Sequence, residues 1–415
     1  RMACVGYQLT GKGFVIEKEQ THNLEKNLIK PLLSGRDITQ KTRNLYAIDT
    51  FGLSSDELMT QFPAIYQWLF DSIKSERELN RDSASNKQWW QFARTRAEFR
   101  PSLSGITSVL ATSLTAKYRT FVPVGNQTIC DSTTVIFALD DFIYLGILSS
   151  RLHCIWSFVA GSKMGVGNDS RYTKSMCFDA FPFPNPTEAQ KTQIRDLAEQ
   201  LDAHRKRQQA AHPDLTLTNM YNVLEKLRLG EPLNDKDKLT HQQGLITILR
   251  ELHDDLDRAV FAAYGWDDLA AQLVGKAGAT TPLPDKPEAQ AQAEEELLTR
   301  LVALNAERAN EEAQGQIRWL RPEFQAPDTQ TSQQTELAVE SEEVEAVSAI
   351  PASKLAWPKV LPEQFKLVRS LLNQPKTLND LNLTFKTKPK ALEEVLETLC
   401  DMGHVQLEQN YYRLI

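Results

Sequence analysis

The segment that decides the fold is GSKMGVGNDSRYTKSMCFDAFPFP, residues 161–184, which holds three glycines, three cations and a closing aromatic–proline run. A phosphate-binding loop requires the pattern G-x-x-x-x-G-K-[S/T], which the spacing of Gly161, Gly165 and Gly167 does not match. A dinucleotide site needs its glycines between a strand and a helix. Here a long apolar run, residues 141–160, comes first, and a polar, proline-broken stretch follows. The segment is therefore not predicted to bind a nucleotide.

The apolar run 141–160 approaches membrane-spanning length but carries Arg151 and His153 near its middle. Charged groups are costly at the centre of a bilayer, so we predict a buried helix of a soluble protein and no membrane partner. No signal peptide is visible, and the five scattered cysteines form no C-x-x-C pair. This cysteine usage is typical of a reducing compartment and predicts a cytoplasmic protein. Because the sequence starts with Arg1, we also expect a fragment or a processed product.

The formal net charge of −7 is unevenly distributed along the chain. Residues 1–185 have a net charge of +4, residues 186–350 of −13, and residues 351–415 of +2. A polyanionic partner such as DNA would therefore meet the first of these sections. Its excess of positive charge is modest, so any nucleic-acid surface must be a local patch.

The first section mixes strands and helices. Residues 44–49, 106–113 and 132–140 are rich in β-branched and aromatic side chains, which predicts three strands. Apolar residues recur at three- and four-residue steps over 55–80, which predicts a helix with Ser55 as its N-cap. Together with the sections that follow, this pattern predicts the α+β class.

The middle of the chain is predicted to be helical. Residues 186–277 form a helical region in which Gly265 ends an amphipathic helix. Residues 278–325 combine a proline-rich break with one long helix. The following residues, 326–350, hold six acids and no base, which is typical of a flexible linker.

The tail, residues 351–415, is predicted to be a separate winged-helix domain, because three helices precede a two-stranded hairpin at 404–415. The third helix would be the recognition helix, and it presents carboxylates, with lysines only at its start: Glu393, Glu394 and Glu397; Lys386, Lys388 and Lys390. Carboxylates beside DNA phosphates are unfavourable. We therefore predict that this domain binds protein, such as a partner subunit of a defence complex, in preference to DNA.

Motifs for catalysis are absent from the sequence. It contains no [N/D/S]-P-P-[Y/F/W] tetrapeptide, no H-E-x-x-H, no G-x-S-x-G and no histidine cluster at metal-ligand spacing. Residues 213–226 faintly resemble part of a nuclease motif, but we interpret them as the solvated start of a helix. We predict no catalytic, cofactor-binding or metal-binding residue in this chain, and the absence of a phosphate loop disfavours a nucleotide-using enzyme.

Cations alternate with aromatic residues between positions 87 and 174, a composition that suits DNA. Lysine and arginine neutralise phosphates, arginine can pair with guanine edges, and flat rings can stack on bases. The predicted DNA-binding residues are Lys87, Trp89, Trp90, Arg94, Arg96, Arg100, Lys117, Arg119, Lys163, Arg171, Tyr172 and Lys174. The alternative interpretation is that the tryptophan pair is part of the core and the arginines form surface ion pairs.

An ordered set of motifs adds a family resemblance that covers essentially the whole chain. The motifs are TGKGFVIEKEQ, IKPLLSGRDI, WWQFARTRAEFR, AKYRTF, LGILSSRLHCIW, GVGNDSRYTKSMCFDAFPFP, LDRAVFAAYGWDDL and LVALNAERANEEAQGQIRWLRPEF. In this order they resemble the C-terminal half of large class I, S-adenosylmethionine-dependent, adenine-specific DNA methyltransferases. These are the enzymes of the fused type II restriction–modification group and of phage-defence systems such as BREX and DISARM.

The resemblance implies that residues 1–185 are a target-recognition region that binds double-stranded DNA. The aromatic–proline segment would close this region and pack back toward the methyltransferase core. The family's catalytic motifs are missing here, so S-adenosylmethionine and the flipped adenine are expected in a catalytic domain upstream or in a separate subunit. The alternative is a stand-alone specificity or scaffold subunit without enzymatic activity.

Overall fold

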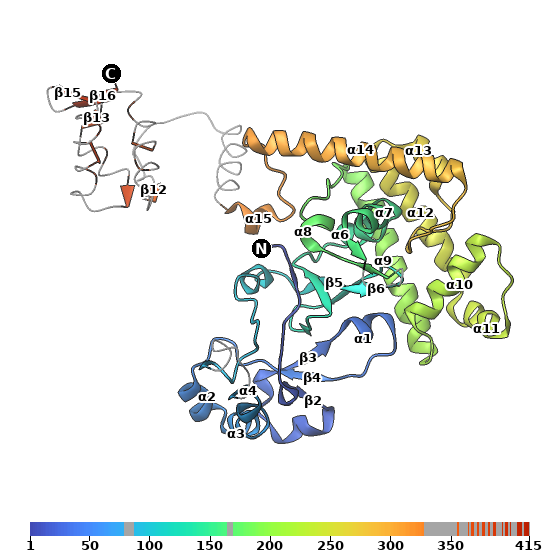
Figure 1. Cartoon of the computed structure of the whole chain (residues 1–415), viewed down its shortest axis with the longest axis horizontal. Coiled ribbons are helices and arrows are strands. Elements are labelled where there is room, and N and C mark those ends of the chain that lie inside the picture. The colour runs from blue at the N-terminus through green and yellow to red at the C-terminus, as the bar shows by residue number, and fades with distance from the viewer. Residues whose placement is uncertain are drawn as a thin grey trace, which may run out of the picture. The chain divides into compact units, whose positions relative to one another are not determined.

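The computed structural model describes residues 1–78, 87–163 and 169–327, together with separate positions between 355 and 414. The chain divides into two compact units, Arg1–Gln330 and Thr331–Ile415. In the first unit, short strands and helices near the N-terminus adjoin a layer of longer helices, as Figure 1 shows. The predicted mixed α and β class is confirmed in this sense.

The central sheet of the first unit has four antiparallel strands in the order β1-β9-β5-β7. They are β1 (Ala3–Val5), β5 (Ser108–Ser113), β7 (Phe121–Gly125) and β9 (Thr134–Phe137). Every residue of β9 is buried: Val135 and Phe137 pack in one hydrophobic cluster with Leu145 and Leu148, and Ile136 packs in another with Ile16 and Ile48. The predicted strands at 106–113 and 132–140 are confirmed by β5 and β9.

Two further sheets complete this part of the unit. One has the order β2-β4-β3-β8 and contains β2 (Val15–Ile16), β3 (Ile29–Leu33), β4 (Tyr46–Ile48) and β8 (Ile129–Cys130). The other has the order β10-β11-β6 and contains β6 (Thr115–Ala116), β10 (Ser162–Lys163) and β11 (Ser170–Arg171). The predicted strand at 44–49 is confirmed by β4.

The helix predicted over 55–80 is broken into shorter pieces. They are α2 (Ser55–Gln61), α3 (Pro63–Leu69), a π-helical turn (Phe70–Lys74) and α4 (Ser75–Glu78). The break falls where Pro63 begins α3, since proline is favoured at the first helical position and has no N–H to continue a preceding helix. The predicted N-cap was wrong by one residue. Ser54 caps α2, and its side chain accepts a hydrogen bond from the Glu57 backbone N–H at 3.2 Å.

The apolar run 141–160 forms two helices, α6 (Phe142–Ser149) and α7 (Arg151–Ala160), bent by 62° at Ser150. Among the described residues, no single helix is long and apolar enough to cross a membrane. The bent pair has the length and composition of a membrane span only when its two helices are taken together. Arg151 and His153 are both buried in the unit. The prediction of one buried helix is thus corrected to a buried pair.

The helical layer follows, in agreement with the predicted change of pattern. Its helices are α9 (Glu188–Ala211), α10 (Leu217–Leu229), α11 (Asp235–Gly244), α12 (Ile246–Tyr264), α13 (Asp267–Leu273) and α14 (Glu288–Ala313). Gly265 ends α12 with φ 72°, a left-handed conformation that glycine adopts without a Cβ clash, as predicted. Residues 213–226, interpreted as solvated, instead bury Met220, Tyr221 and Leu224 of α10.

One hydrophobic cluster joins the helical layer to the recognition section. It contains Tyr118, Ile143, Ile147, Leu152 and Trp156 from before residue 185, packed with buried residues of α9, α10, α12, α13 and α14. The cluster runs across the predicted boundary at residue 185. The two sections are therefore parts of one folded unit.

In the second unit, β13 (Lys376–Thr377), β15 (Val405–Glu408) and β16 (Tyr411–Leu414) form an antiparallel sheet in the order β13-β16-β15. A separate pair joins β12 (Leu355–Ala356) to β14 (Phe385–Lys386). The buried apolar residues are Val368, Leu372, Leu381, Leu392, Val395, Leu396, Leu399 and Val405. The hairpin predicted at 404–415 is confirmed by β15 and β16. The glutamates and two of the lysines, Lys388 and Lys390, of the predicted recognition helix, and most of the predicted linker, lie outside the described residues.

Candidate nucleic-acid interface

The tryptophan pair of the predicted patch lies inside the unit. Trp89 is buried and packs edge-to-face against Tyr66, Phe70 and Trp90. Trp90 is half-buried, and its indole N–H donates a hydrogen bond to the Leu53 carbonyl at 2.9 Å. Both rings therefore pack within the protein core. The prediction that they stack on DNA bases is corrected, and the alternative that the tryptophan pair is part of the core holds.

Arg100 and Arg96 also serve the fold. The guanidinium of Arg100 donates two hydrogen bonds to the Asp49 carboxylate, at 2.8 and 2.9 Å, and lies 4.2 Å from the centre of the Phe51 ring. Arg96 has a left-handed backbone, with φ 53°, and its Nε donates to the Gly6 carbonyl at 3.0 Å. An ion pair, as in the alternative interpretation, describes Arg100 better than DNA contact does, although the pair is largely buried and not at the surface.

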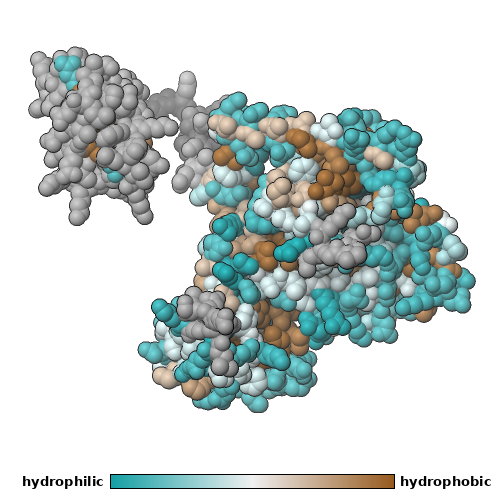
Figure 2. Space-filling view, viewed as in Figure 1, coloured by the Kyte–Doolittle hydropathy of each residue, from teal (hydrophilic) through white to brown (hydrophobic). Residues whose placement is uncertain are grey.

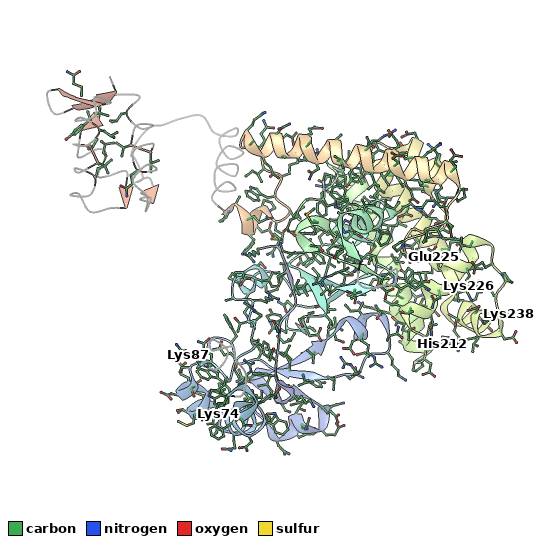
Figure 3. All side chains as sticks on the ribbon, in the orientation of Figure 1. Lys74, Lys87, His212, Glu225, Lys226 and Lys238 are labelled. Atoms are coloured by element: carbon green, nitrogen blue, oxygen red, sulfur yellow. The ribbon has the colours of Figure 1, made fainter. Side chains whose placement is uncertain are left out.

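Lys87 and Arg94 are the exposed cations of the same segment. The side chain of Arg94 makes no hydrogen bond or ion pair within the part of the chain that the structure describes, while its backbone N–H and C=O bridge Gln8. Figure 3 places Lys87 near Lys74, at the end of the unit built by α2 to α4. Lys87 and Arg94 keep their charges available to a polyanion, whereas Lys74 is half-buried and its ammonium lies 4.4 Å from the centre of the Phe70 ring.

The second group of predicted residues surrounds the small β10-β11-β6 sheet. Lys117, just after β6, is exposed, and its ammonium donates to Asn222 Oδ1 at 2.8 Å. Arg171 in β11 is also exposed and pairs through its backbone with Thr115 of β6. Tertiary structure thus brings Lys117 and Arg171 to one sheet, although 54 positions separate them in the sequence.

Arg119 is fully buried and cannot contact DNA in this conformation. Its guanidinium donates to the Thr112 hydroxyl at 3.1 Å, to the Ser113 carbonyl and to the Ser170 carbonyl at 2.9 Å. Burial lowers its pKa, because desolvation disfavours the charged form. The prediction is corrected: Arg119 fastens β5 to β11.

Tyr172 is fully buried too, and it forms a structural pair with His153. The Tyr172 hydroxyl lies 2.9 Å from His153 Nε2, and the ring packs on the Arg119 guanidinium at 5.1 Å. Burial raises the pKa of Tyr172 well above its ordinary value. Burial, followed by the nearby Arg119 charge, lowers the pKa of His153 to about 3, so this imidazole is neutral at physiological pH. The prediction of a DNA contact by Tyr172 is therefore corrected.

The opening glycine and the remaining two cations have different surroundings. A Cβ added at Gly161 would lie 2.6 Å from the Arg171 carbonyl, so this glycine serves close packing of the chain on itself and not the approach of a phosphate. Lys174 is half-buried and forms an ion pair with Asp179. Lys163 lies in β10, and its side chain lies outside the described residues, so its contact with DNA stays a prediction.

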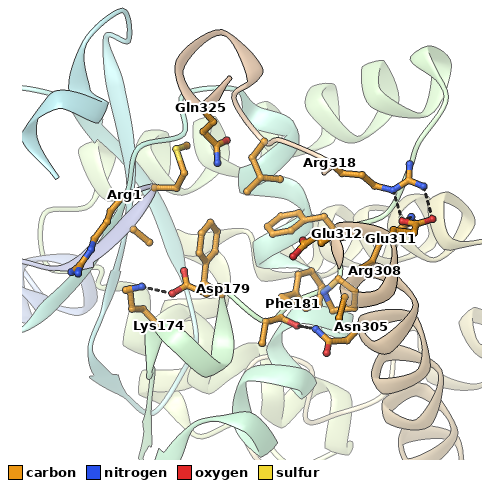
Figure 4. Close-up of a pocket in the computed structure, with 18 of the residues that line it drawn as sticks. Arg1, Lys174, Asp179, Phe181, Asn305, Arg308, Glu311, Glu312, Arg318 and Gln325 are labelled. Atoms are coloured by element: carbon orange, nitrogen blue, oxygen red, sulfur yellow. Dashed lines mark hydrogen bonds and ion pairs between the residues drawn. The ribbon is translucent and has the colours of Figure 1, made fainter. Parts of the chain in front are cut away.

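The aromatic–proline strap borders a cavity of about 490 Å³ next to α14 (Figure 4). Phe181 is buried and packs against the rings of His153, Trp156 and Phe183. Asn305 of α14 holds the strap by donating to the Ala180 carbonyl at 2.5 Å. The charged groups on the rim are largely paired, as with Glu311 and Arg318 at 3.0 Å. The cavity therefore reflects how the strap meets α14, and the strap is structural.

Sequence reasoning missed an exposed loop, residues 40–44, after α1 (Gly35–Thr39). Gln40 Nε2 donates to the Thr218 hydroxyl at 2.8 Å, and Lys41 forms an ion pair with Asp214 at 3.3 Å. The guanidinium of Arg43 donates to the Asp37 carboxylate, which holds the pKa of that carboxyl below its usual range despite partial burial. No local sequence signal pairs this loop with residues near position 218, because only the fold brings them together.

The face of the molecule in Figure 2 is largely hydrophilic, with an apolar area beside α14. Among the described residues, no three His, Cys, Asp or Glu side chains gather as a metal site. The geometry thus offers polar and cationic contacts at the surface.

Comparison with known proteins agrees with this geometry. Residues 8–185 match the family model described as "MmeI, target recognition domain". The chain is 26% identical to DNA methyltransferase A of Bacillus subtilis (strain 168) over 153 residues. The aligned region covers 36% of this chain and 16% of that relative. The solved structure of the type IIL restriction–modification enzyme MmeI in complex with DNA matches with a TM-score of 0.53 at 16% identity, over 74% of this chain and 36% of that one.

These matches define a methyltransferase-associated recognition region, so the predicted family resemblance is confirmed. More narrowly, residues 8–185 are similar to the target recognition domain of MmeI. The likeness to the solved structure concerns the fold. The chain spans about a sixth of the curated relative and about a third of the solved one.

Proposed function

We propose that this chain is the DNA-sequence recognition portion of a site-specific, adenine-specific DNA methyltransferase of a restriction–modification or phage-defence system. The match of residues 8–185 to the target recognition domain family carries the proposal. The exposed cations Lys87, Arg94, Lys117 and Arg171 on that domain support it, because such side chains neutralise phosphates and can pair with base edges.

In this proposal the chain supplies grip and sequence choice, and methyl transfer takes place in a catalytic domain that this sequence does not contain. That domain would bind S-adenosylmethionine and accept the flipped adenine. Arg100, Arg119 and Tyr172 keep the recognition surface rigid from within, since their side chains bind the protein's own carboxylates, carbonyls and imidazole.

The proposal is tested by measuring binding of the whole chain to duplex DNA, first with a randomised library and then with the selected sequence, over a salt series. We expect affinity to fall steeply with salt, since each neutralised phosphate adds about 0.9 to the slope of log affinity against log salt. One enriched sequence is expected from the selection. Equal binding to every sequence, or no binding at low salt, would contradict the proposal.

The tail is proposed to be a winged helix that binds a protein partner, such as a subunit of a defence complex. The three-stranded sheet β13-β16-β15 and its buried cluster support this fold. Removal of residues 351–415 should then leave affinity for DNA and its salt slope unchanged. A loss of affinity would assign the tail to DNA instead.

A further inference from the structure

A polar cleft lies between the recognition domain and the helical layer, where α1, β6 and α10 lie side by side (Figure 1). It has a volume of about 210 Å³. Its lining is mostly polar, includes one carboxylate and comes from four separate parts of the chain: Thr39, Gln40, Thr115, Ala116, Lys117, Tyr118, Thr120, Asp169, Leu217 and Thr218. Two of these residues belong to α10, which lies outside the matched domain.

The orientation of Asn222 on α10 is fixed by its neighbours. Its Oδ1 accepts hydrogen bonds from the Lys117 ammonium at 2.8 Å and from the Tyr118 hydroxyl at 2.7 Å. An ammonium can only donate, so the oxygen of the side-chain amide must face Lys117. The amide NH₂ of Asn222 therefore points elsewhere, and it makes no hydrogen bond within the described ranges of the chain. These two donors lie beside a lysine whose charge has no carboxylate partner there.

An ion pair beside the cleft, between two residues that do not line it, is weak enough for a ligand to replace it. The Lys41–Asp214 pair is 3.3 Å long, with 64% and 100% of the two side chains exposed. Exposed ion pairs contribute little to stability. The Lys117 ammonium donates to a neutral amide and lies 5.0 Å from the centre of the Tyr118 ring, so a phosphate oxygen, being charged, would be a stronger acceptor than that amide.

We infer that this cleft, together with Asn222 beside it, is a contact for the phosphate backbone of DNA, with Lys117 of the lining and the adjoining Asn222 as donors and α10 as part of the DNA-binding surface. This deepens the proposed function and rests on it. It extends the interface beyond residues 8–185 into the helical layer. A phosphate is favoured over a base edge because the adjacent groups, Lys41 and Lys117, are flexible point charges with no fixed fork to read a base.

The experiment compares DNA binding by the whole chain and by two variants. Asn222→Asp keeps an oxygen toward Lys117 and Tyr118 but replaces the amide donors with a negative charge. Its affinity should fall about tenfold or more, as for a lost hydrogen bond to a charged group. Lys117→Gln should reduce the salt slope by about one. Asn310→Asp, at an exposed position of α14, adds the same charge elsewhere and should leave affinity nearly unchanged.

The outcomes separate this inference from the function on which it rests. Thermal melts first show whether the two cleft variants are folded. If the wild-type chain binds DNA, and the folded variants bind it with the same affinity and the same salt slope, the cleft is not an interface. The proposed function would then still stand. If affinity falls equally for every sequence in the selected and randomised duplexes, the phosphate assignment is supported, whereas a loss at one base position would overturn it. If the wild-type chain binds no DNA, both proposals fail.

Discussion

Arg94 and Arg100 lie six residues apart in one segment and have opposite surroundings. Arg94 is exposed, with no side-chain partner in the described part of the chain. Arg100 binds Asp49 through two hydrogen bonds, with 18% and 9% of the two side chains exposed. Sequence spacing treats the two as equals. Only their environments show which one is available to a ligand and which one maintains the fold.

Replacing Arg100 by alanine should lower the free energy of unfolding by about 2 kcal/mol, because it leaves the largely buried Asp49 carboxylate without its partner. Arg94→Ala should change that free energy by less than about 0.5 kcal/mol and should instead weaken DNA binding. Urea unfolding followed by tryptophan fluorescence, together with DNA titrations, measures both. A stable Arg100→Ala variant that binds DNA poorly would reverse the assignment.

The buried His153 predicts a dependence of stability on pH. Its pKa is about 3 in the folded chain and about 6.5 in an unfolded one, where the imidazole is solvated. As pH falls below 6.5, the unfolded chain takes up a proton that the folded chain does not, so stability is lost. At pH 5 this amounts to about 2 kcal/mol for this group.

His153→Gln retains a partner for Tyr172 but does not titrate, so the difference between its unfolding free energies at pH 7 and pH 5 should be smaller by about that amount. The comparison of variant with wild type is needed because Asp257 acts in the other direction: burial raises its pKa to about 6. Chemical unfolding at several pH values provides the measurement. Identical pH slopes for the two proteins would show that His153 is accessible to protons.

At the scale of elements, the segment after α14, residues 316–327, ties the helical layer back to the central sheet. Arg321 is buried, and its guanidinium donates to the carbonyls of Ser102 at 2.6 Å, Ala138 at 3.2 Å and Ser104 at 3.0 Å. Tyr144 adds a hydrogen bond to the Leu320 carbonyl at 2.6 Å. Three carbonyls from two separate parts of the chain thus accept hydrogen bonds from the Arg321 guanidinium. These bonds fix the angle between the segment 316–327 and the central sheet.

Arg321→Lys should weaken this junction, because the lysine ammonium is a single donor atom and cannot reach all three carbonyls that the guanidinium reaches. We expect faster amide hydrogen exchange over residues 316–327 in both Arg321→Lys and Arg321→Ala, with exchange in β5 little changed. Arg318→Lys, in the more exposed ion pair with Glu311 and also within residues 316–327, is the matched control. Unchanged exchange in the Arg321 variants would mean that the segment is held by other contacts.

At the scale of the whole molecule, the first unit should fold as one. Because Tyr118, Leu152 and Trp156 share a cluster with α9, α10, α12, α13 and α14, a chain ending at residue 185 would expose that cluster to water. We expect residues 1–185 alone to aggregate or to lack a cooperative unfolding transition, whereas residues 1–330 should unfold cooperatively. Circular dichroism and calorimetry of the two truncations test this. A cooperative transition for 1–185 would contradict the shared core.

Much of this organisation is determined by the sequence alone. The strands β4, β5 and β9, the amphipathic α12 ending at Gly265 and the order of the family motifs are all local patterns, and each was predicted. Such patterns work because backbone preference and hydrophobic periodicity act over a few residues. The division of the chain's charge, with the positive excess in the first section, is likewise fixed before folding.

Only the tertiary structure decides which polar side chains are available. Trp89, Arg119 and Tyr172 have the residue types of a DNA interface and are buried. Gln40 lines the cleft and Lys41 and Asn222 lie beside it, although the sequence predicted a site at none of the three. Burial depends on which distant segments pack over a residue, and no local pattern encodes that. Sequence therefore determined the kind of protein this is, while long-range packing determined which of its cations can reach a ligand.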